Sequence, residues 1–339
     1  MSKKLPLLLL VMLLAPGVAS AGPITSLYVF GDSLSDSGNA FLLTGGFPPP
    51  PYAQRASNGP VAVERLAFDL GLTLTPAALG GTNYAFVGAT TGPVQIPGSA
   101  PPVFVDNIAT ITYGQAALAG TSLLNQVAAF TSTGPVADPD GSLFFVWAGA
   151  NDFFINPSLQ TGANAITSIA GSINALYTDG AREFLIPNLP DLSLTPTAQG
   201  LTPAEQLGLR QLSISFNIGL ASALGGLSAL PGIKITPFDA FSLVSSIVAD
   251  PAANGFTNAS APCLTGIVFT GNGSVCSNPD SFVFWDGAHP TSAAHRVLGD
   301  AFAAAVPEPA TLTLLGLGMA LGFRSRRVSR SSQGLQARS

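Results

Sequence analysis

Basic residues are scarce in this chain, and most of those present lie near its two ends. The 339 residues include 13 Lys and Arg, and seven of these stand before residue 5 or after residue 323. Residues 22–305 keep 6 basic and 17 acidic side chains, so their net charge is near −11. Nucleic-acid binding requires clustered Lys and Arg, and anionic membrane surfaces repel such a charge. We therefore expect neither nucleic acid nor an anionic membrane surface as a partner.

Cysteine is almost absent as well. Cys263 and Cys276 stand alone in a loop rich in Gly, Asn and Ser. Two thiolates without a neighbouring histidine cannot complete the four-ligand shell of a zinc site, so we expect no metal, and nothing in the sequence implies another cofactor. In an oxidising compartment the two would form a disulfide, and closing a loop of about 14 residues is worth about 3 kcal/mol in the chain-entropy model.

The first 21 residues have the features of a secretory signal peptide. Lys3 and Lys4 precede the apolar stretch 5–14, and residues 19–21 (Ala-Ser-Ala) are the small residues that signal peptidase prefers. The apolar stretch is short for a bilayer-spanning helix, which argues against a permanent anchor. We expect residues 1–21 to be removed on export into an oxidising compartment.

The C-terminal segment, residues 306–330, carries a second targeting feature. A Pro-Glu-Pro box at 307–309 precedes the apolar stretch 310–323, and four arginines follow between positions 324 and 330. The combination resembles the PEP-CTERM sorting signal of Gram-negative, exopolysaccharide-producing bacteria. That resemblance implies transient inner-membrane anchoring by a short transmembrane segment, with the arginines cytoplasmic, and removal of the tail by the sorting machinery. A plain C-terminal membrane anchor is the alternative.

Between the two ends, apolar strand patterns alternate with helical patterns. The predicted strands are 27–30, 83–87, 143–147, 183–186 and 233–235, and the predicted helices are 61–70, 123–130, 163–178, 203–224 and 291–305. This alternation predicts a parallel sheet with helices on both faces. We expect residues 22–305 to form one α/β domain, a three-layer αβα sandwich of flavodoxin-like character, and to be a monomer.

The serine at position 33 stands directly after the predicted strand 27–30, in Gly31-Asp32-Ser33-Leu34. Gly, Asp and Ser favour a strand-to-helix turn, and the carboxyl edge of a parallel sheet is where open α/β folds bind their ligands. We expect Ser33 to be a nucleophile, and its close rivals Ser35 and Ser37 to point elsewhere. Gly-x-Ser-x-Gly occurs nowhere in the chain, which argues against an ordinary α/β-hydrolase.

Histidine is as scarce as cysteine, which narrows the choice of a base to His289 and His295. His289 lies in a loop bounded by Gly287 and Pro290, where its ring can face the sheet edge and Asp286 can reach its second nitrogen. A serine nucleophile needs such a base and such an orienting carboxylate. His295 falls on the polar side of the predicted helix 291–305, so we expect it to be solvated or to cap a helix.

The negative charge that develops during acyl transfer requires two or three hydrogen-bond donors. The Ser33 backbone N–H is the first, and Asn151, after the predicted strand 143–147, can donate through its side-chain amide. A turn-forming role is the alternative for Asn151. Asp152 is expected to cap the following helix or to bond back to the turn. Asp32 and Asp36 have a spacing that suits capping better than metal or glycosidase chemistry.

Three blocks of sequence resemble those that define the GDSL-type esterases and lipases, the SGNH hydrolases. They are GDSLSDSGN at 31–39, GANDFF at 149–154 and DGAHPT at 286–291. Further stretches at 55–67, 80–91, 186–196 and 239–260 resemble the branch that includes bacterial lipases, haemolysin-like phospholipases and plant GDSL esterases. The resemblance covers residues 25–305. It implies the αβα fold and hydrolysis of carboxylic esters by Ser33, His289 and Asp286.

One block departs from the family pattern. Where the family carries Asn-Tyr/Phe-Ala-x-Gly, with the glycine N–H as third oxyanion donor, this chain has Asn83-Tyr84-Ala85-Phe86-Val87-Gly88. Val87 stands at the glycine position and can still donate if its φ is negative. A positive φ would strain valine and pass the role to Gly88. We name Gly88 as the expected donor.

The sequence therefore predicts a secreted or envelope-associated serine esterase. Lipid, phospholipid and acetylated polysaccharide esters all fit the same catalytic groups. The alternative is a non-catalytic, exopolysaccharide-associated envelope protein on an esterase scaffold. Two irregular stretches rich in Pro and Gly, 44–59 and 92–113, are expected to flank the site and to shape a pocket for the acyl or alcohol group, with loops of no function as the alternative.

Overall fold

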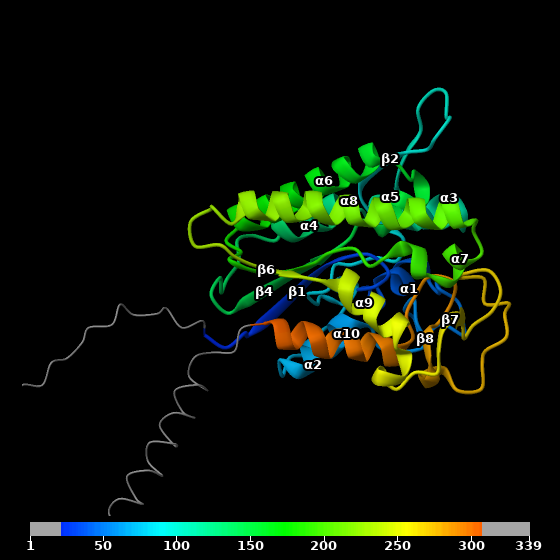
Figure 1. Ribbon diagram of the computed structural model, residues 1–339. Helices are drawn as coiled ribbons and strands as arrows, with labels where there is room; N and C mark the ends of the chain where they lie inside the picture. The colour runs from blue at the N-terminus through cyan, green and yellow to red at the C-terminus, as the bar shows by residue number, and fades with distance from the viewer. Residues whose placement is uncertain (1–21, 307–339) are drawn as a thin grey trace, which may run out of the picture. The chain divides into compact units, whose positions relative to one another are not determined.

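The computed structural model describes residues 22–306, which fold around a parallel β-sheet (Figure 1). Its strands lie in the order β1 (Ser26–Gly31), β4 (Ser142–Trp147), β5 (Glu183–Pro187) and β6 (Lys234–Phe238). All neighbouring pairs are parallel, and every residue of β4 is buried, as is typical of a strand covered on both faces. The predicted signal peptide and the C-terminal segment from 307 onward lie outside the described residues.

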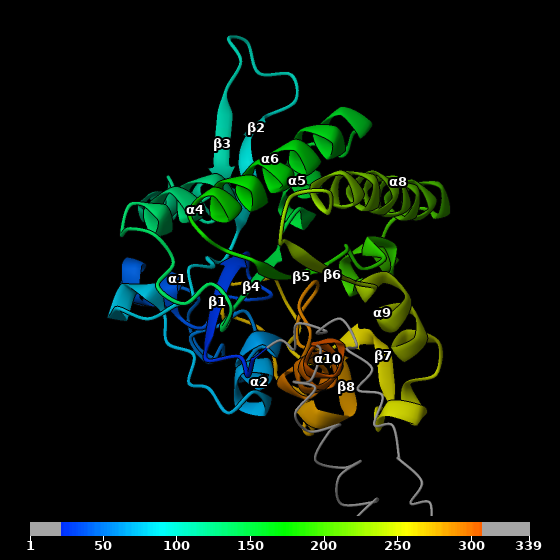
Figure 2. The same ribbon diagram turned by 90° about the vertical axis from the view of Figure 1, so that its left-hand side faces the viewer.

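Helices cover both faces of this sheet (Figures 1 and 2). One face carries α4 (Leu123–Thr131), α6 (Leu159–Thr178) and α8 (Pro203–Leu227), and the other carries α2 (Ala62–Asp69), α9 (Ala240–Ala249) and α10 (Ser292–Ala305). Side chains alternate along the strands, so Phe30 and Phe144 join the core under the first group while Leu143 and Phe145 join the core under the second. This confirms the predicted three-layer αβα sandwich.

The long helices begin where the sequence supplies caps. Thr202 and Glu205 form a capping box at the start of α8, with Thr202 N–H donating to the Glu205 carboxylate at 2.9 Å and Pro203 in the first helical position. Thr291 Oγ1 accepts from Ala294 N–H at 3.2 Å and caps α10. All five predicted helices are present, and α6 and α8 are longer than predicted.

The strand predicted over 83–87 is wrong as a regular strand. The segment lies beside β1 in the parallel direction, and Tyr84 N–H donates to Val29 O at 2.7 Å. The pairing stops short of a regular ladder because the Gly31 N–H of β1 donates to Gln126 Oε1 at 2.9 Å and not to this segment. The Asn83 Oδ1 accepts from Ala85 N–H at 3.0 Å, so a side-chain bond also shapes the backbone locally. The segment still leads the chain from the sheet edge to the site described below.

Short elements gather around the carboxyl ends of the strands. They are α1 (Asn39–Thr44), α3 (Ile108–Thr112), α5 (Ala150–Ile155), α7 (Pro196–Gln199), the antiparallel pair β2 (Ala89–Gln95) and β3 (Phe104–Asn107), and the parallel pair β7 (Asn258–Pro262) and β8 (Phe282–Phe284). The β2–β3 hairpin projects beyond the helices (Figure 2). Within residues 22–306, no helix combines the length and the apolar character needed to cross a bilayer.

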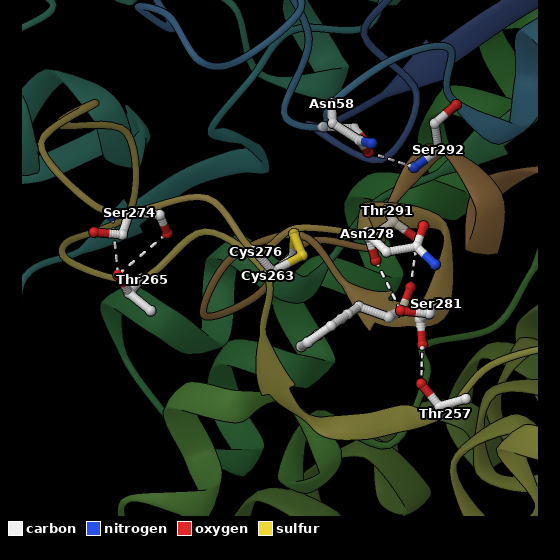
Figure 3. Close-up of a disulfide and its surroundings, with 12 residues drawn as sticks. Asn58, Thr257, Cys263, Thr265, Ser274, Cys276, Asn278, Ser281, Thr291 and Ser292 are labelled. Carbon is white, nitrogen blue, oxygen red and sulfur yellow. Dashed lines mark hydrogen bonds between the residues drawn. A yellow bond between two sulfur atoms is a disulfide. The ribbon is translucent and has the colours of Figure 1, made fainter.

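The structure joins Cys263 and Cys276 in a disulfide, with the two Cα atoms 4.9 Å apart (Figure 3). The loop that it closes is held against the segment after β8, because Leu264 N–H donates to Trp285 O at 2.6 Å. Thr265 and Ser274 pair across the loop (Figure 3). The disulfide loop, residues 263–276, therefore lies beside the chain segment that carries Asp286 and His289.

Candidate active site

Ser33 follows β1 at the carboxyl edge of the sheet, where Gly31 begins the turn. Gly31 has a φ of 155°, and a Cβ on it would lie 2.2 Å from the Trp147 carbonyl oxygen, so glycine alone fits here. The Gln126 side chain of α4 holds this glycine: its Nε2 donates to Gly31 O at 2.8 Å and its Oε1 accepts from Gly31 N–H at 2.9 Å. The backbone position of Gly31, from which the turn to Ser33 begins, is therefore fixed by the Gln126 side chain.

The turn after Ser33 is organised by Asp36. This buried carboxylate accepts from three backbone N–H groups at the start of α1 and from Val87 N–H at 2.9 Å. Burial raises the pKa of Asp36 to about 6, although the backbone hydrogen bonds act to lower it. The expected capping role of Asp36 is confirmed. Ser35 and Ser37 are buried within the same turn, and of the three serines Ser33 lines the cavity described below.

The structure brings Ser33, His289 and Asp286 together at this edge. His289 Nε2 lies 3.0 Å from Ser33 Oγ, and His289 Nδ1 lies 2.9 Å from both carboxylate oxygens of Asp286. The backbone N–H groups of Ala288 and His289 also donate to Asp286 Oδ1. Burial alone would raise the pKa of Asp286, but the charge and hydrogen bonds of His289 and the N–H group of Ala288 outweigh burial and hold this pKa below its usual value. Asp286 is thus a carboxylate that can stabilise an imidazolium.

The expected oxyanion donors line one cavity with the catalytic candidates Ser33 and His289. Asn151 is buried and donates one Nδ2 hydrogen to Ala89 O at 2.9 Å, which leaves its second amide hydrogen for another acceptor. Across residues 22–306, the structure pairs no acceptor with the backbone N–H of Ser33 or Gly88. The arrangement therefore offers up to three N–H donors on the wall of a single cavity.

Val87 and Gly88 differ in backbone conformation. The positive φ falls on Gly88, at 78°, and not on Val87. A Cβ on Gly88 would also lie 2.5 Å from Asn107 Oδ1, so both the conformation and the space select glycine. Val87 is fully buried and escapes the strain that a positive φ would impose on it.

The cavity in front of Ser33 has a volume of about 390 Å³ and a largely apolar wall. The wall includes Ile108, Phe153, Leu192, Leu209, Val268 and Phe269. The stretch 92–113 contributes Ile108, Ala109 and Tyr113, as expected. In the part of the chain that the structure describes, no residue of the stretch 44–59 lines the cavity, so the pocket-shaping role expected for that stretch is wrong. It approaches Asp286 instead, through Tyr52.

His295 occupies a different environment from the one expected. It is 1% exposed, on the face of α10 that packs against α2, and its Nδ1 accepts from Ala62 N–H at 3.2 Å. The expectation of a solvated side chain is wrong, but His295 does cap a helix, since Ala62 is the first residue of α2. Burial, assisted by the charge of His289, lowers the pKa of His295 to about 3. The ring is therefore neutral and separate from the Ser33 cluster.

Two further buried carboxyl groups lie near the site. Asp152 accepts from Thr91 N–H at 3.0 Å and from Thr91 Oγ1 at 2.6 Å, so it ties α5 to β2. The expectation that its side chain caps the helix or bonds back to the turn is wrong. Asp32 accepts from Leu34 N–H at 3.0 Å within the turn. Burial raises the pKa of Asp152 to about 7 and that of Asp32 to about 6. No cluster of His, Cys, Asp and Glu suited to a metal ion occurs among residues 22–306.

Sequence reasoning missed two side chains at the site. Tyr52 donates from its hydroxyl to Asp286 Oδ2 at 2.8 Å across 234 positions of sequence. Gln126 fixes Gly31 from a helix 95 positions away. The proline-rich context of Tyr52 marks a loop but not its target, and Gln126 looks like any polar residue of an amphipathic helix.

The chain is similar to known proteins over most of its length. The profile of the GDSL-like Lipase/Acylhydrolase family matches residues 27–302, and that of the PEP-CTERM protein-sorting motif matches residues 305–327. A GDSL esterase/lipase of Arabidopsis thaliana is 30% identical over 82% of this chain and 81% of its own length. The thermolabile hemolysin of Vibrio parahaemolyticus is 28% identical over 82% of this chain and 62% of its own length.

Among solved structures, a member of the lipolytic protein G-D-S-L family from Veillonella parvula aligns with a TM-score of 0.43 and 13% identity, over 81% of this chain and 94% of that one. The family profile spans nearly the whole αβα domain, including the segments that carry Ser33, Asn151, Asp286 and His289. The chain therefore belongs to the GDSL-like lipase/acylhydrolase family and is a carboxylic ester hydrolase.

Proposed function

We propose that this esterase acts through an acyl-serine intermediate, with Ser33 as the nucleophile, His289 as the general base and Asp286 as the orienting carboxylate. The contact that carries the proposal is the 3.0 Å distance from His289 Nε2 to Ser33 Oγ. That distance allows direct transfer of the hydroxyl proton to the ring. The 2.9 Å contacts of Nδ1 with Asp286 fix the tautomer that leaves Nε2 as the acceptor.

The reaction then proceeds in two halves. Ser33 Oγ attacks the ester carbonyl carbon while His289 Nε2 takes the proton, and the Asp286 charge stabilises the imidazolium. His289 returns this proton to the departing alcohol, which leaves the acyl group on Ser33. A water molecule, deprotonated by His289, attacks the acyl-serine carbonyl, and His289 then gives that proton to Ser33 Oγ as the carboxylic acid is released.

The carbonyl oxygen gains negative charge in both halves. The Ser33 N–H, the Gly88 N–H and the second amide hydrogen of Asn151 are the proposed donors to it. All three residues line the cavity and are largely buried. Donors held in a water-poor site stabilise a developing charge more than the same groups do in water.

The cavity supports an ester whose acyl chain is longer than acetyl. Its apolar wall and volume of about 390 Å³ suit a hydrocarbon chain, as in a lipid or phospholipid. Each buried methylene is worth up to about 0.8 kcal/mol, so such a wall discriminates by chain length. An acetyl group would leave most of this wall uncovered.

The PEP-CTERM motif indicates export to the envelope of a Gram-negative bacterium. We propose in addition that residues 1–21 are a signal peptide that is removed, and that the C-terminal segment anchors the chain in the inner membrane until the sorting machinery cleaves it. Detection of an N-terminus at Gly22 and loss of the tail in exported protein, by mass spectrometry, would test both processing steps.

The catalytic assignment is tested by labelling with a fluorophosphonate, which reacts with activated serines. The parent protein should be labelled and should hydrolyse a reporter ester, whereas Ser33→Ala should do neither while keeping the parent melting temperature. Ser35→Ala is the matched control and should retain labelling. Labelling that persists in Ser33→Ala would overturn the assignment, and an unreactive, folded parent would favour a non-catalytic envelope protein.

A further inference from the structure

The hydroxyl group of Tyr52 links three separate parts of the chain. It donates to Asp286 Oδ2 at 2.8 Å and accepts from Phe269 N–H at 2.9 Å. Tyr52 lies in the proline-rich stretch 44–59, and Phe269 lies in the disulfide loop 263–276. The stretch 44–59 and the disulfide loop thus meet beside the Asp286 carboxylate that contacts His289.

The surroundings of Tyr52 fix this hydroxyl in place. The residue is 5% exposed, and its ring packs against Phe269 and Trp285 with centroids 5.1 and 6.2 Å away. Burial raises the pKa of Tyr52, and the charge of Asp286 raises it further, so the hydroxyl keeps its proton. The direction of the bond is therefore set: Tyr52 donates and the carboxylate accepts.

Asp286 Oδ2 has few other partners. The backbone N–H groups of Ala288 and His289 donate to Oδ1, whereas Oδ2 contacts Tyr52 and His289 Nδ1. Without Tyr52, one oxygen of a buried carboxylate would rely on the imidazole alone. Its negative charge would then be less dispersed and would attract a proton on the ring more strongly.

We infer that Tyr52 is a positioning residue for the proposed reaction. Its hydroxyl holds the Asp286 carboxylate against His289, and the hydrogen bond disperses the negative charge on Oδ2. This role rests on the proposed function of the Ser33–His289–Asp286 cluster. Tyr52 is not among the described residues that line the cavity. Its hydroxyl contacts Asp286 and the N–H of Phe269, which does line it, so the pH profile is needed to separate an effect through Asp286 from one through the wall.

The test replaces Tyr52 by phenylalanine, which keeps the ring packing and removes the donor. For Tyr52→Phe we expect kcat to fall about tenfold with KM within twofold of the parent, since the charge-assisted hydrogen bond to the orienting carboxylate is lost. The acid limb of the kcat/KM profile should move to higher pH, because a more basic carboxylate holds the imidazolium proton longer. Asp32, His295 and Tyr113 also interact electrostatically with this pair and stay unaltered.

Tyr177→Phe is the matched control. Its hydroxyl likewise donates one hydrogen bond, to Pro231 O at 2.9 Å, and makes none with the Ser33–His289–Asp286 cluster. We expect parent kcat and a parent pH profile for this variant. A Tyr52→Phe enzyme with the parent pH profile would overturn the inference, whatever its melting temperature, because a purely structural role moves stability and not the acid limb.

A second readout does not depend on turnover. The proton between His289 Nδ1 and Asp286 should give a far-downfield NMR signal in the Ser33→Ala background. Adding Tyr52→Phe should shift this signal, and adding Tyr177→Phe should not. An unchanged signal in the Tyr52→Phe background would contradict the positioning role. Absence of ester hydrolysis in the parent would instead sink the proposed function, and the NMR comparison would still decide the role of Tyr52.

Discussion

The backbone N–H of Val87 donates to Asp36 Oδ2 at 2.9 Å, while the next residue, Gly88, lines the cavity with a φ of 78°. The Val87 N–H already donates to the Asp36 carboxylate, so it cannot also make a full hydrogen bond to a developing oxyanion. The family pattern alone leaves the choice between the two residues open. The bond to Asp36 favours Gly88 as the third proposed donor.

Substitutions at these two positions should therefore have opposite outcomes. Val87→Gly keeps the N–H that binds Asp36 and should preserve kcat within a few-fold, with some loss of stability from a fully buried side chain. Gly88→Ala meets both a positive φ and Asn107 Oδ1 at 2.5 Å, so kcat should fall at least tenfold. Steady-state kinetics and melting curves of both variants check this. A severe kcat defect in Val87→Gly with normal Gly88→Ala would reverse the assignment.

Asn151→Ala removes the proposed side-chain donor. Loss of one oxyanion donor costs on the order of a hundredfold to a thousandfold in kcat, and we expect a loss in that range with KM little changed. Asn164→Ala is the matched control, since this exposed amide of α6 only accepts from Gln160. Near-parent turnover in Asn151→Ala would mean that Asn151 serves only the bond to Ala89 O.

His295 should make the protein less stable in acid. Its pKa is about 3 in the folded chain against an ordinary 6.5, so its contribution to stability is fully present above pH 6.5 and is lost as pH falls toward 3. The slope is about 1.4 kcal/mol per pH unit within that window. His295→Asn keeps an acceptor for Ala62 N–H but cannot titrate, so its stability should fall less on acidification than that of the parent.

Urea unfolding at several values of pH between 4 and 8 measures this difference. Asp32, Asp36 and Asp152 have raised pKa values and contribute with the opposite sign, but they are common to both proteins and cancel in the comparison. Parallel stability curves for the parent and His295→Asn would show that the ring does not stay neutral in the folded chain.

Opening the disulfide should affect both stability and turnover. The Cys263→Ser/Cys276→Ser double variant loses a loop constraint worth about 3 kcal/mol. It should also free Phe269, whose ring centroid lies 4.9 Å from that of His289. We expect a lower melting temperature and reduced kcat, measured with and without dithiothreitol. The reductant should lower the melting temperature of the parent and leave the double variant unchanged; equal responses would refute a structural disulfide.

The cavity predicts a preference for longer acyl chains. Along a series of p-nitrophenyl esters from acetate to octanoate, kcat/KM should rise with each methylene until the cavity is filled. Ala198→Leu places extra volume on the wall and should penalise octanoate more than acetate. A parent that prefers acetate would point to an acetylated polymer as substrate.

The parts of the site that could be predicted from sequence are those set by local signals. Ser33 follows a strand directly, and Asp286 and His289 stand three residues apart in one loop, so their proximity needs little knowledge of the fold. Gly88 was the expected third donor because a positive φ would strain Val87, and its role as a donor stays a proposal. The alternation of apolar strands and helices was likewise sufficient for the αβα layers.

The remaining features depend on long-range packing. Polar residues around His295 suggested a solvent-facing position, but α10 packs on α2 and turns this ring toward the Ala62 N–H. The Gln126 side chain takes the Gly31 N–H that a regular ladder with residues 83–87 would use, and hydropathy does not report such a bond. The partner of Tyr52 is 234 positions away, and no periodic pattern encodes such a contact.

The hydrogen bonds of Asp36 have a consequence for motion. This one carboxylate binds the backbone at the start of α1, which follows the Ser33 turn, and the N–H of Val87, next to Gly88, so the segments that carry the two proposed main-chain donors share a common partner. Thermal displacement of the turn would carry both donors together and keep their spacing. The oxyanion site would then be assembled when the chain folds, before any ester arrives.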